Sequence, residues 1–259
     1  SEAAWQAAER GVQVVLYEMR PVTRTPAHKT GNCAELVCSN SLGNNLAPSA
    51  PFILKEELRS LKSIVIASGD KNSVPAGSAL AVDRDLFSQE ITSKLSNHPN
   101  ITFKREEVVE IPQEGPVIIA TGPLTSPRLS EQISKLIGQE YLYFYDALSP
   151  IVDANSIDYD KAFFASRYDK GDADYLNCPM NAEQYYEFVR ELKASEKVPF
   201  ASFEKAIYFE GCMPIEELAE RGDRTLAFGP LKPVGLPDPK TGRVAHAVVQ
   251  LRRENRESS

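Results

Sequence analysis

The chain has 259 residues and a formal net charge of −7, and 42% of its residues are hydrophobic while 25% are charged. This length allows a large core and fits about two domains, and no apolar run approaches the ~20 residues that a membrane span requires. The acidic balance argues against a broadly basic nucleic-acid coat, although a local Lys/Arg patch could still hold RNA. The four cysteines are too few for a disulfide scaffold, which indicates reduced thiols in a cytoplasmic protein.

The beginning of the chain predicts a helix followed by a strand that ends in an acid. Residues 1–10 are nearly all good helix formers, and Ser1 is suited to the cap. Residues 12–17 are typical of a buried strand, and Glu18 follows directly. These elements are half of a dinucleotide-binding βαβ unit, whose acid binds ribose hydroxyls and whose Gly-rich turn precedes the helix. The pattern therefore predicts a chain cut at its N-terminus, although strands of many folds also end in an acid.

Two cysteines lie in the segment 33–43, which is rich in small polar residues. Cys38 is followed by serine, asparagine and serine, whose hydroxyl and amide groups and turn-prone backbone favour a ligand-binding loop. Free cysteines are also among the most buried residues, so a role in packing stays open for each thiol. For Cys33 packing is the favoured interpretation.

Two helices are predicted after the cysteine segment. The first covers residues 53–62, and its leucines share one face, which predicts packing against a core. These leucines are Leu54, Leu58 and Leu61. The second helix follows the short apolar stretch 79–82, and Asp83 is suited to cap it. Its apolar residues recur every four positions and predict a second buried face, formed by Phe87, Ile91 and Leu95.

The next segment predicts strands and one more helix. Residues 101–111 and residues 116–123 are typical of strands, and the second run contains the turn Ala120-Thr-Gly122. A turn of small residues lets a backbone approach a cofactor closely, although the same string is common where any strand enters a loop. Ser126 then predicts the start of a helix that ends near Gly138.

From about residue 141 the sequence becomes more aromatic, and we place a domain boundary near residue 148. The predicted domains are residues 1–148 and 149–259. Residues 141–145, just before the second domain, and residues 162–168 within it are typical of strands. Residues 226–251 are typical of several strands joined by Gly/Pro turns. Asn181 caps a predicted helix that runs through Lys193. Its inward-facing residues are predicted to be Tyr185, Phe188 and Val189.

A second candidate for a reactive thiol is Cys212. Pro214 is suited to the first turn of a helix, which would place the thiol near a helix N-terminus. Free backbone N–H groups and the helix dipole favour the thiolate there. Glu210 and Glu216 lie close in sequence and act in the opposite direction, because nearby negative charge raises a thiol pKa.

Six segments spread over nearly the whole chain together resemble one enzyme family. They are Ser1-Glu-Ala-Ala-Trp5, Tyr17-Glu-Met-Arg-Pro21, Cys33-Ala-Glu-Leu-Val-Cys-Ser-Asn-Ser-Leu42, Ala120-Thr-Gly122, Phe209-Glu-Gly-Cys-Met-Pro-Ile-Glu216 and Gly229-Pro-Leu-Lys-Pro-Val-Gly235. The chain resembles the folate- and FAD-dependent tRNA (uracil-5-)-methyltransferases, known as TrmFO or Gid, which form ribothymidine in the T loop. The Ala-Thr-Gly turn alone is shared by many flavoproteins, whereas the two cysteine contexts together are specific.

The resemblance implies an α/β fold, with a truncated Rossmann-like FAD-binding domain and a second α+β insertion domain. It implies Cys212 as the nucleophile and Cys38 as the thiol for proton handling or an enzyme intermediate, and these assignments could be exchanged. It implies that FAD is bound by Glu18, Arg20, Ser39, Asn40, Ser41, Leu42, Ala120, Thr121 and Gly122. Lys232 and Arg243 are candidates for the folate or tRNA surface. The family's Gly-rich motif and C-terminal segment are absent, so an internal piece of a longer enzyme is predicted.

The implied chemistry fits two thiols and a flavin. Thiolate addition at C6 of uracil makes C5 nucleophilic toward a one-carbon unit, and a base then removes the C5 proton so that the thiol can leave. The methylene group of methylenetetrahydrofolate is one reduction short of methyl, and a flavin reduced by NAD(P)H would supply the hydride. The target base must also be exposed from the folded T loop of the tRNA.

Other interpretations remain at this stage. A flavin oxidoreductase with redox cysteines would share the nucleotide-binding half-motif, but it predicts a closer pair than Cys33 and Cys38. A zinc site made by the four cysteines is disfavoured because structural zinc usually takes tight pairs. A non-catalytic fragment that binds RNA or a partner is the third alternative. The three histidines show no triad or ligand spacing.

Overall fold

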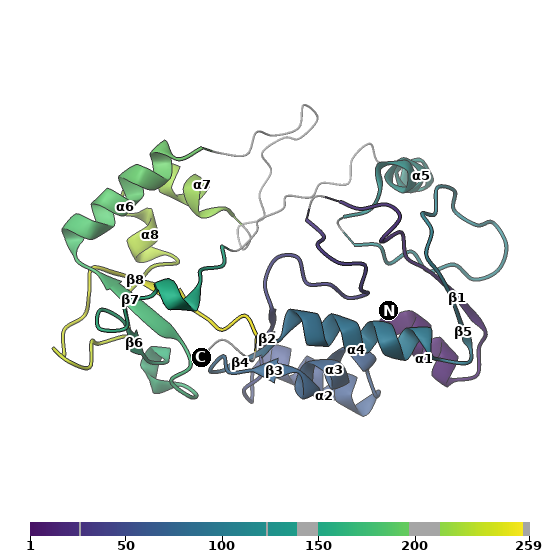
Figure 1. The fold of residues 1–259 in the computed structure, drawn as a ribbon, viewed down its shortest axis with the longest axis horizontal. Helices are drawn as coiled ribbons and strands as arrows, with labels where there is room; N and C mark the ends of the chain where they lie inside the picture. The colour runs from purple at the N-terminus through teal and green to yellow at the C-terminus, as the bar shows by residue number, and fades with distance from the viewer. Residues whose placement is uncertain (26, 123, 139–149, 197–212, 256–259) are drawn as a thin grey trace. The chain divides into compact units, whose positions relative to one another are not determined.

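The computed structural model describes residues 1–25, 27–122, 124–138, 150–196 and 213–255, which form two compact units (Figure 1). The first unit comprises the described residues of Ser1–Leu42, Ala47–Ser73 and Val82–Leu148, and the second comprises those of Gly43–Leu46, Val74–Ala81 and Ser149–Ser259. Parallel and antiparallel strands are both present, so the predicted mixed α/β class is confirmed. Among the helices of the described part of the chain, none is long and apolar enough to cross a membrane.

The elements up to residue 138 alternate between helices and short strands. They are α1 (Glu2–Glu9), β1 (Val14–Tyr17), β2 (Ser41–Asn44), α2 (Ala50–Ser60), α3 (Ile64–Lys71), β3 (Ser73–Val74), β4 (Ala79–Val82), α4 (Arg84–Ser96), β5 (Ile101–Lys104) and α5 (Pro127–Ile137). Strands β2, β4 and β3 form one sheet in that order.

A parallel strand pair, β1 and β5, organises the first unit. Val14 pairs with Ile101 and Tyr17 with Lys104, and α1 and α4 lie beside the pair (Figure 1). The predicted first helix and strand are confirmed, although Ser1 caps α1 without a side-chain hydrogen bond. The prediction that residues 12–17 form a buried strand is wrong in part, because the strand begins at Val14, alternate residues face solvent and Val15 is 51% exposed.

Helix α4 contributes four buried side chains to the first unit, Phe87, Ser88, Ile91 and Leu95. Asp83 caps it by accepting a hydrogen bond from the backbone N of Leu86 at 3.0 Å, as predicted. The predicted apolar face is fully buried, with exposures of 0–1% at Phe87, Ile91 and Leu95. Four-residue spacing places these side chains on one stripe, which packs on the alanines of α1 and on β5. The buried face of α4 therefore holds the helix firmly in the core of the first unit.

Three further predictions for the first unit are wrong. Helix α2 forms where it was expected, but Leu54 and Leu61 are 56% and 58% exposed, so the predicted core face points to solvent. Residues 116–122 form no strand, and Ile118 is 72% exposed. An apolar run becomes a strand only when a neighbour accepts and donates the ladder hydrogen bonds, and none of the described strands lies beside it. Strand β5 also ends at Lys104, before the predicted end at residue 111.

The second unit is built on an antiparallel sheet. Its elements after residue 150 are η1 (Ala154–Ser156), β6 (Phe163–Phe164), η2 (Arg167–Asp169), β7 (Leu176–Met180), α6 (Ala182–Ala194), α7 (Ile215–Glu220), α8 (Thr225–Phe228) and β8 (Ala247–Leu251). The sheet order is β6-β7-β8, and Leu176 of β7 pairs with Leu251 of β8. The predicted helix after Asn181 is confirmed and begins with a capping box. Its residues Tyr185 and Val189 are 0% and 2% exposed.

Other predictions for the second unit differ from the structure or lie outside it. The strand predicted over residues 162–168 is reduced to two residues, and the run 226–251 begins with helix α8 and forms a strand only at its end. Buried Leu226 and Ala227 pack on α6 as one helical turn, so their apolar character reflects burial. The strand predicted at residues 141–145 falls outside the described residues.

Candidate functional site

The acid after β1 makes a close ion pair with an arginine two residues later. The side chain of Arg20 donates from Nε to Glu18 Oε1 at 2.8 Å and from Nη2 to Oε2 at 3.0 Å. Its backbone N also donates to Oε1 at 3.0 Å. Arg20 is only 5% exposed, and a buried guanidinium requires such partners. Two residues predicted to bind FAD are thus brought together, and they bind each other.

Glu35 also binds Arg20, and it is not among the site residues predicted from the sequence. Nη1 of Arg20 lies 2.7 Å from Glu35 Oε2. The backbone N of Lys29 and the hydroxyl of Thr30 also donate to the Glu35 carboxylate, at 2.8 and 3.0 Å. The signal was a charged residue between the two cysteines in an otherwise apolar and small segment. Glu35 therefore joins the residues after β1 to the cysteine segment.

Arg105, the residue after strand β5, supports the same cluster. Its Nη1 donates to the carbonyl oxygens of Arg20, at 3.0 Å, and of Gly31, and its guanidinium lies 4.3 Å from the ring centre of Phe103. Burial acts to raise the pKa of Glu18, but hydrogen bonds from Arg20 and the charges of Arg20 and Arg105 outweigh it and hold that pKa below its usual range. Glu18 is therefore ionised and acts only as an acceptor.

The Glu18 carboxylate keeps some capacity to bind a further donor. A carboxylate offers about four acceptor positions, and three donors of Arg20 use its two oxygens. The Glu18 side chain is 18% exposed, so it is reachable from solvent. This geometry fits one ribose hydroxyl of a dinucleotide at the end of β1.

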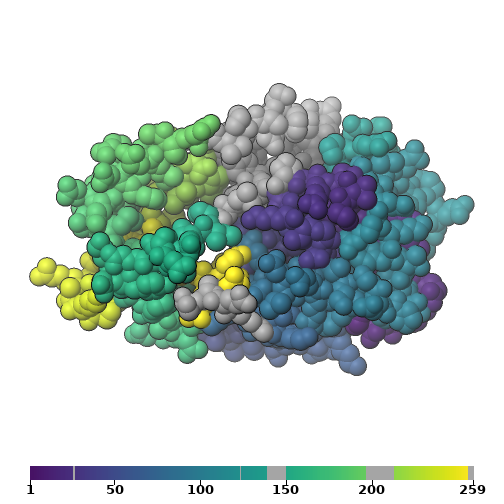
Figure 2. Space-filling view, in the orientation of Figure 1, coloured from purple at the N-terminus to yellow at the C-terminus, as the bar shows by residue number. Residues whose placement is uncertain are grey.

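The two thiols of the cysteine segment differ in environment. Cys33 is 3% exposed and packs in the core of the first unit, as predicted for a packing residue. Burial, followed by the charge of Glu18, raises the pKa of its thiol, which disfavours the reactive thiolate. Cys38 is exposed, and the segment after β1 that contains it lies on the visible surface of the first unit (Figure 2). Only Cys38 of this pair is placed to meet a substrate.

The loop that contains Cys38 ends earlier than predicted. Strand β2 begins at Ser41, so the predicted loop ends at Asn40. Asn40 is 1% exposed, and its side-chain amide donates to the carbonyl of Val82 at 3.1 Å. The backbone N of Val82 in turn donates to the carbonyl of Asn40 at 2.9 Å. The amide of Asn40 thus holds the end of the cysteine segment on β4.

The turn Ala120-Thr-Gly122 is exposed. Gly122 has φ +69°, a conformation that favours glycine, and the hydroxyls of Thr121 and Thr125 lie 2.6 Å apart. The turn therefore has its own internal hydrogen bond. Among the described residues, the hydrogen bonds of this turn are made with Thr125 and do not involve Glu18 or Cys38.

The remaining predicted residues belong to the second unit. Cys212 lies outside the described residues. The helix expected after it is α7, and Pro214 is its N-cap instead of lying in its first turn. Lys232 and Arg243 are exposed. Over the described ranges of the chain, no group of three or more His, Cys, Asp or Glu side chains could hold a metal ion.

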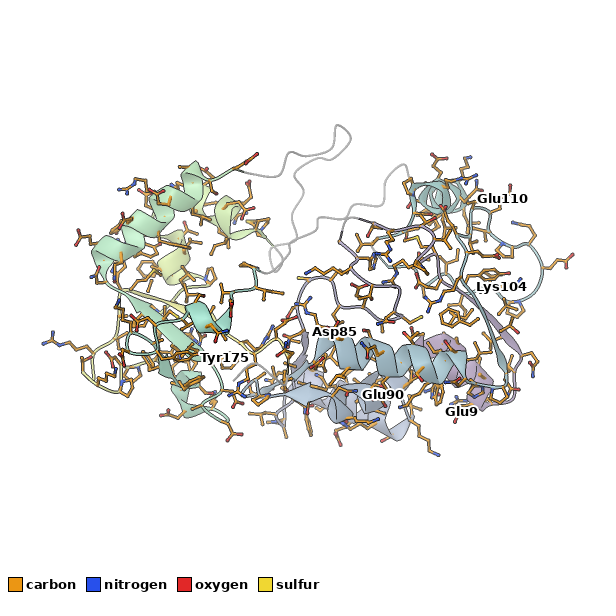
Figure 3. The ribbon with its side chains drawn as sticks, viewed as in Figure 1. Glu9, Asp85, Glu90, Lys104, Glu110 and Tyr175 are labelled. Carbon is orange, nitrogen blue, oxygen red and sulfur yellow. The ribbon has the colours of Figure 1, made fainter. Side chains whose placement is uncertain are left out.

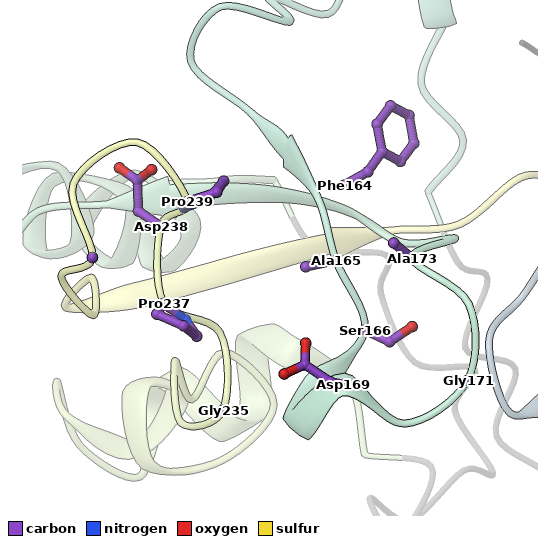
Figure 4. Close-up of a pocket in the computed structure, with 11 residues that line it drawn as sticks. Phe164, Ala165, Ser166, Asp169, Gly171, Ala173, Gly235, Pro237, Asp238 and Pro239 are labelled. Carbon is purple, nitrogen blue, oxygen red and sulfur yellow. The ribbon is translucent and has the colours of Figure 1, made fainter.

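The second unit contains a cavity of about 410 Å³, and Figure 4 draws the residues that line it. Its lining includes Phe164, Asp169 and Pro237, together with Gly235 from the last of the six resemblance segments. Tyr168 and Asp169 adopt φ values of +59° and +52°, which non-glycine residues rarely adopt. The described residues that line this cavity include none of those predicted to bind FAD.

Comparisons with known proteins agree with the resemblance found in the sequence. The family model "Glucose inhibited division protein A" matches residues 1–259. The chain is 61% identical over 259 residues to a protein of Heliobacterium modesticaldum, covering 100% of this chain and 59% of the relative. Proteins of Bacillus velezensis and Bacillus subtilis are 60% and 59% identical over 255 residues, covering 98% of this chain and 58% of each relative.

These three relatives carry the name "Methylenetetrahydrofolate--tRNA-(uracil-5-)-methyltransferase TrmFO". The chain spans less than three fifths of their length. The predicted resemblance to TrmFO proteins is thereby confirmed, and the chain belongs to the glucose inhibited division protein A family.

Proposed function

We propose that this protein is a methylenetetrahydrofolate-dependent tRNA (uracil-5-)-methyltransferase that forms 5-methyluridine in the T loop. The observation that carries the proposal is the identity of 59–61%, across nearly the whole chain, to proteins of that name. The exposure of Cys38 is consistent with it, because a thiol that meets a large substrate must be accessible. A cytoplasmic location, where thiols stay reduced, belongs to the same proposal.

FAD is the proposed cofactor, and the first unit is the proposed FAD-binding domain with a Rossmann-like fold. Glu18 would accept a hydrogen bond from the adenosine ribose. Arg20 holds the Glu18 carboxylate in place, and Glu35 in turn binds Arg20. By resemblance, the segments 39–42 and 120–122 would lie along the flavin. When bound and reduced by NAD(P)H, the flavin supplies the hydride that completes the methyl group.

The thiols carry the proposed covalent chemistry. One thiolate, assigned by resemblance to Cys212, adds to C6 of the uracil and makes C5 nucleophilic toward the methylene group of the folate. The second, Cys38, serves in removal of the C5 proton, and the two roles could be exchanged. We propose that residues 149–259 form the insertion domain, in which Lys232 and Arg243 present positive charge to folate or tRNA phosphate.

The test is methyl transfer by the protein as its gene encodes it. Unmodified tRNA, methylenetetrahydrofolate, FAD and NAD(P)H are supplied, and 5-methyluridine is measured by mass spectrometry of the digested tRNA. Formation of 5-methyluridine is expected, with loss of about 100-fold or more of the rate in Cys38→Ser and Cys212→Ser. Cys178→Ser, a half-buried thiol in β7, is the matched control and should keep its rate. Absence of 5-methyluridine with the wild-type protein would reject the proposal.

A further inference from the structure

The segment from Cys33 to Cys38 runs along α4 in the opposite direction to the helix and is attached to it at two points. At one point the hydroxyl of Thr92 accepts from the backbone N of Cys33 at 2.8 Å and donates to the carbonyl of Ser88 at 2.7 Å. At the other point Arg84 binds the segment near Cys38. The two helix residues are eight positions apart, which corresponds to about 12 Å along a helix.

Arg84 holds the backbone on both sides of Val37. Its Nη1 donates to the carbonyl of Leu36 at 2.6 Å, and its Nη2 donates to the carbonyl of Cys38 at 3.0 Å. A guanidinium carries its donors in a rigid planar fork, so it can bridge two carbonyls at a fixed separation. A lysine ammonium is a single point and cannot reproduce this bridge.

The position of Arg84 in α4 gives its charge no stabilising interaction with the dipole of its own helix. Arg84 is the first residue of the helix, where a cation interacts unfavourably with the helix dipole. Asp83 caps the helix, and Asp85, labelled in Figure 3 at the same end of α4, adds a negative charge in the first turn. The positive charge is thus unfavourable for the helix dipole, whereas the side chain binds two carbonyls of the cysteine segment.

Helix α4, which carries Arg84, is anchored in the core, whereas the Cys38 side chain is not buried. Phe87 and Ile91 anchor α4 with exposures of 1% and 0%, whereas Cys38 is exposed. A side chain on an exposed loop reaches a productive geometry reliably only when its backbone is held by groups that are themselves fixed. The Arg84 bridge, the Thr92 hydrogen bond and the Asn40 amide supply this support along the segment.

We propose that Arg84 is a positioning residue, which fixes the backbone at Leu36 and Cys38 and thereby the place of the Cys38 thiol in the methyl-transfer reaction. The proposal rests on the proposed function, because that function assigns Cys38 a part in the chemistry. Arg84 acts through the loop, and no contact between its side chain and the substrate is required. A misplacement of about 1 Å at a reacting group can reduce a rate by about 100-fold.

The test compares Arg84→Lys and Arg84→Met in the protein as its gene encodes it. Amide hydrogen exchange of the peptide that covers residues 34–40 is expected to rise about tenfold or more in both variants, because two hydrogen bonds to that backbone are lost. The kcat for 5-methyluridine formation is expected to fall about 10- to 100-fold, with KM for tRNA and folate within about twofold of wild type. Lysine keeps the charge but should not rescue either value.

Arg59→Lys is the matched control. Arg59 also makes a two-point interaction in the first unit, at 2.8 and 2.7 Å to the Asp70 carboxylate, and its replacement should leave exchange in residues 34–40 and kcat unchanged. Wild-type exchange and kcat in Arg84→Lys would overturn the proposal. Because the lysine variant keeps a long cationic side chain at an intermediate-exposure site, it tests the proposal even if Arg84→Met does not fold. Raised exchange in Arg84→Lys with an inactive wild-type protein would instead reject the proposed function and with it the catalytic part of this proposal, and it would leave only the attachment of the segment by Arg84.

Discussion

Glu18 and Arg20 form a two-point ion pair directly after β1, with 2.8 Å between Arg20 Nε and Glu18 Oε1 and 3.0 Å between Nη2 and Oε2. Arg20 bridges in turn to Glu35, 15 residues later, at 2.7 Å. The end of the strand and the start of the cysteine segment are thereby joined through one buried guanidinium. Two predicted cofactor-binding residues thus have a structural function that is independent of any cofactor.

The first prediction concerns Glu18→Gln. Replacing the carboxylate removes charged hydrogen bonds to buried Arg20, so the free energy of unfolding at pH 7 should fall by about 2 kcal/mol. Because the pKa of Glu18 is lowered in the folded protein, its contribution is present above the unfolded pKa of about 4.3 and is lost as pH falls through the folded pKa. Urea denaturation at pH 7 and at pH 3 should show the difference between wild type and variant shrinking at the acidic pH.

Glu110→Gln is the control for this experiment, because Glu110, labelled in Figure 3, is an exposed glutamate of the same unit. Its effect on the free energy of unfolding should stay within about 0.5 kcal/mol at pH 7. An equal loss in both variants at pH 7 would show that the ion pair with Arg20 does not stabilise the fold.

The second prediction concerns thiol reactivity. Cys38 is exposed, whereas Cys33 is 3% exposed and burial raises its thiol pKa. Iodoacetamide at pH 7.5 should therefore alkylate Cys38 faster than Cys33 by about tenfold or more. Mass spectrometry of peptides at timed intervals measures both rates in one sample. Equal rates would show that the segment opens readily and that Cys33 is not held in the core.

The third prediction concerns the amide of Asn40. Asn40→Ala leaves the buried carbonyl of Val82 without the 3.1 Å hydrogen bond from the Asn40 side chain, and the free energy of unfolding should fall by about 1–3 kcal/mol. Asn97→Ala is the matched control, because the amide of Asn97 donates to the carbonyl of Ser93 at 2.9 Å on the surface. Water can replace that donor, so its loss should be below about 0.5 kcal/mol. Urea denaturation of both variants gives the comparison.

The fourth prediction concerns Gly235 in the second unit. It has φ +79°, and a Cβ there would lie 2.8 Å from the ring of Tyr168. Gly242 has φ +68°, and a Cβ there would meet nothing within 4 Å. Both alanine variants carry the backbone strain of about 1 kcal/mol, but only Gly235→Ala must also move the ring, so its loss of stability should be larger by about 1–2 kcal/mol. Similar losses would show that Tyr168 moves aside freely.

The local signals in the sequence predict a large part of this fold. Asp83 and Asn181 are followed by helices because a side-chain oxygen can accept from the backbone N–H three residues on. The four-residue spacing of Phe87 and Ile91 then predicts which face is buried. The position of Glu18 after the first strand, the packing of Cys33 and the exposed loop at Cys38 were also predicted, since each depends on a few neighbouring residues.

Predictions from the sequence are wrong where the structure of a segment depends on distant residues. The apolar residues of 116–122 read as a strand, yet a strand needs ladder hydrogen bonds from another segment. The leucines of α2, such as Leu54, show a good apolar stripe, but a stripe is buried only if another element covers it. Helical periodicity shows which side chains share a face and contains no information about what faces them.

The sequence by itself determined the family, the α/β class, the helices with strong caps and the two thiol contexts, because these depend on short-range spacing. Only the tertiary structure decided that Glu35 binds Arg20 across 15 positions and that Arg84 holds the carbonyl of Cys38 across 46 positions. Hydrogen bonds between such distant residues form when packing brings their elements together. In the sequence, Glu35 and Arg84 do not differ from ordinary charged residues of the surface. The support of the exposed thiol is therefore a property of the folded chain.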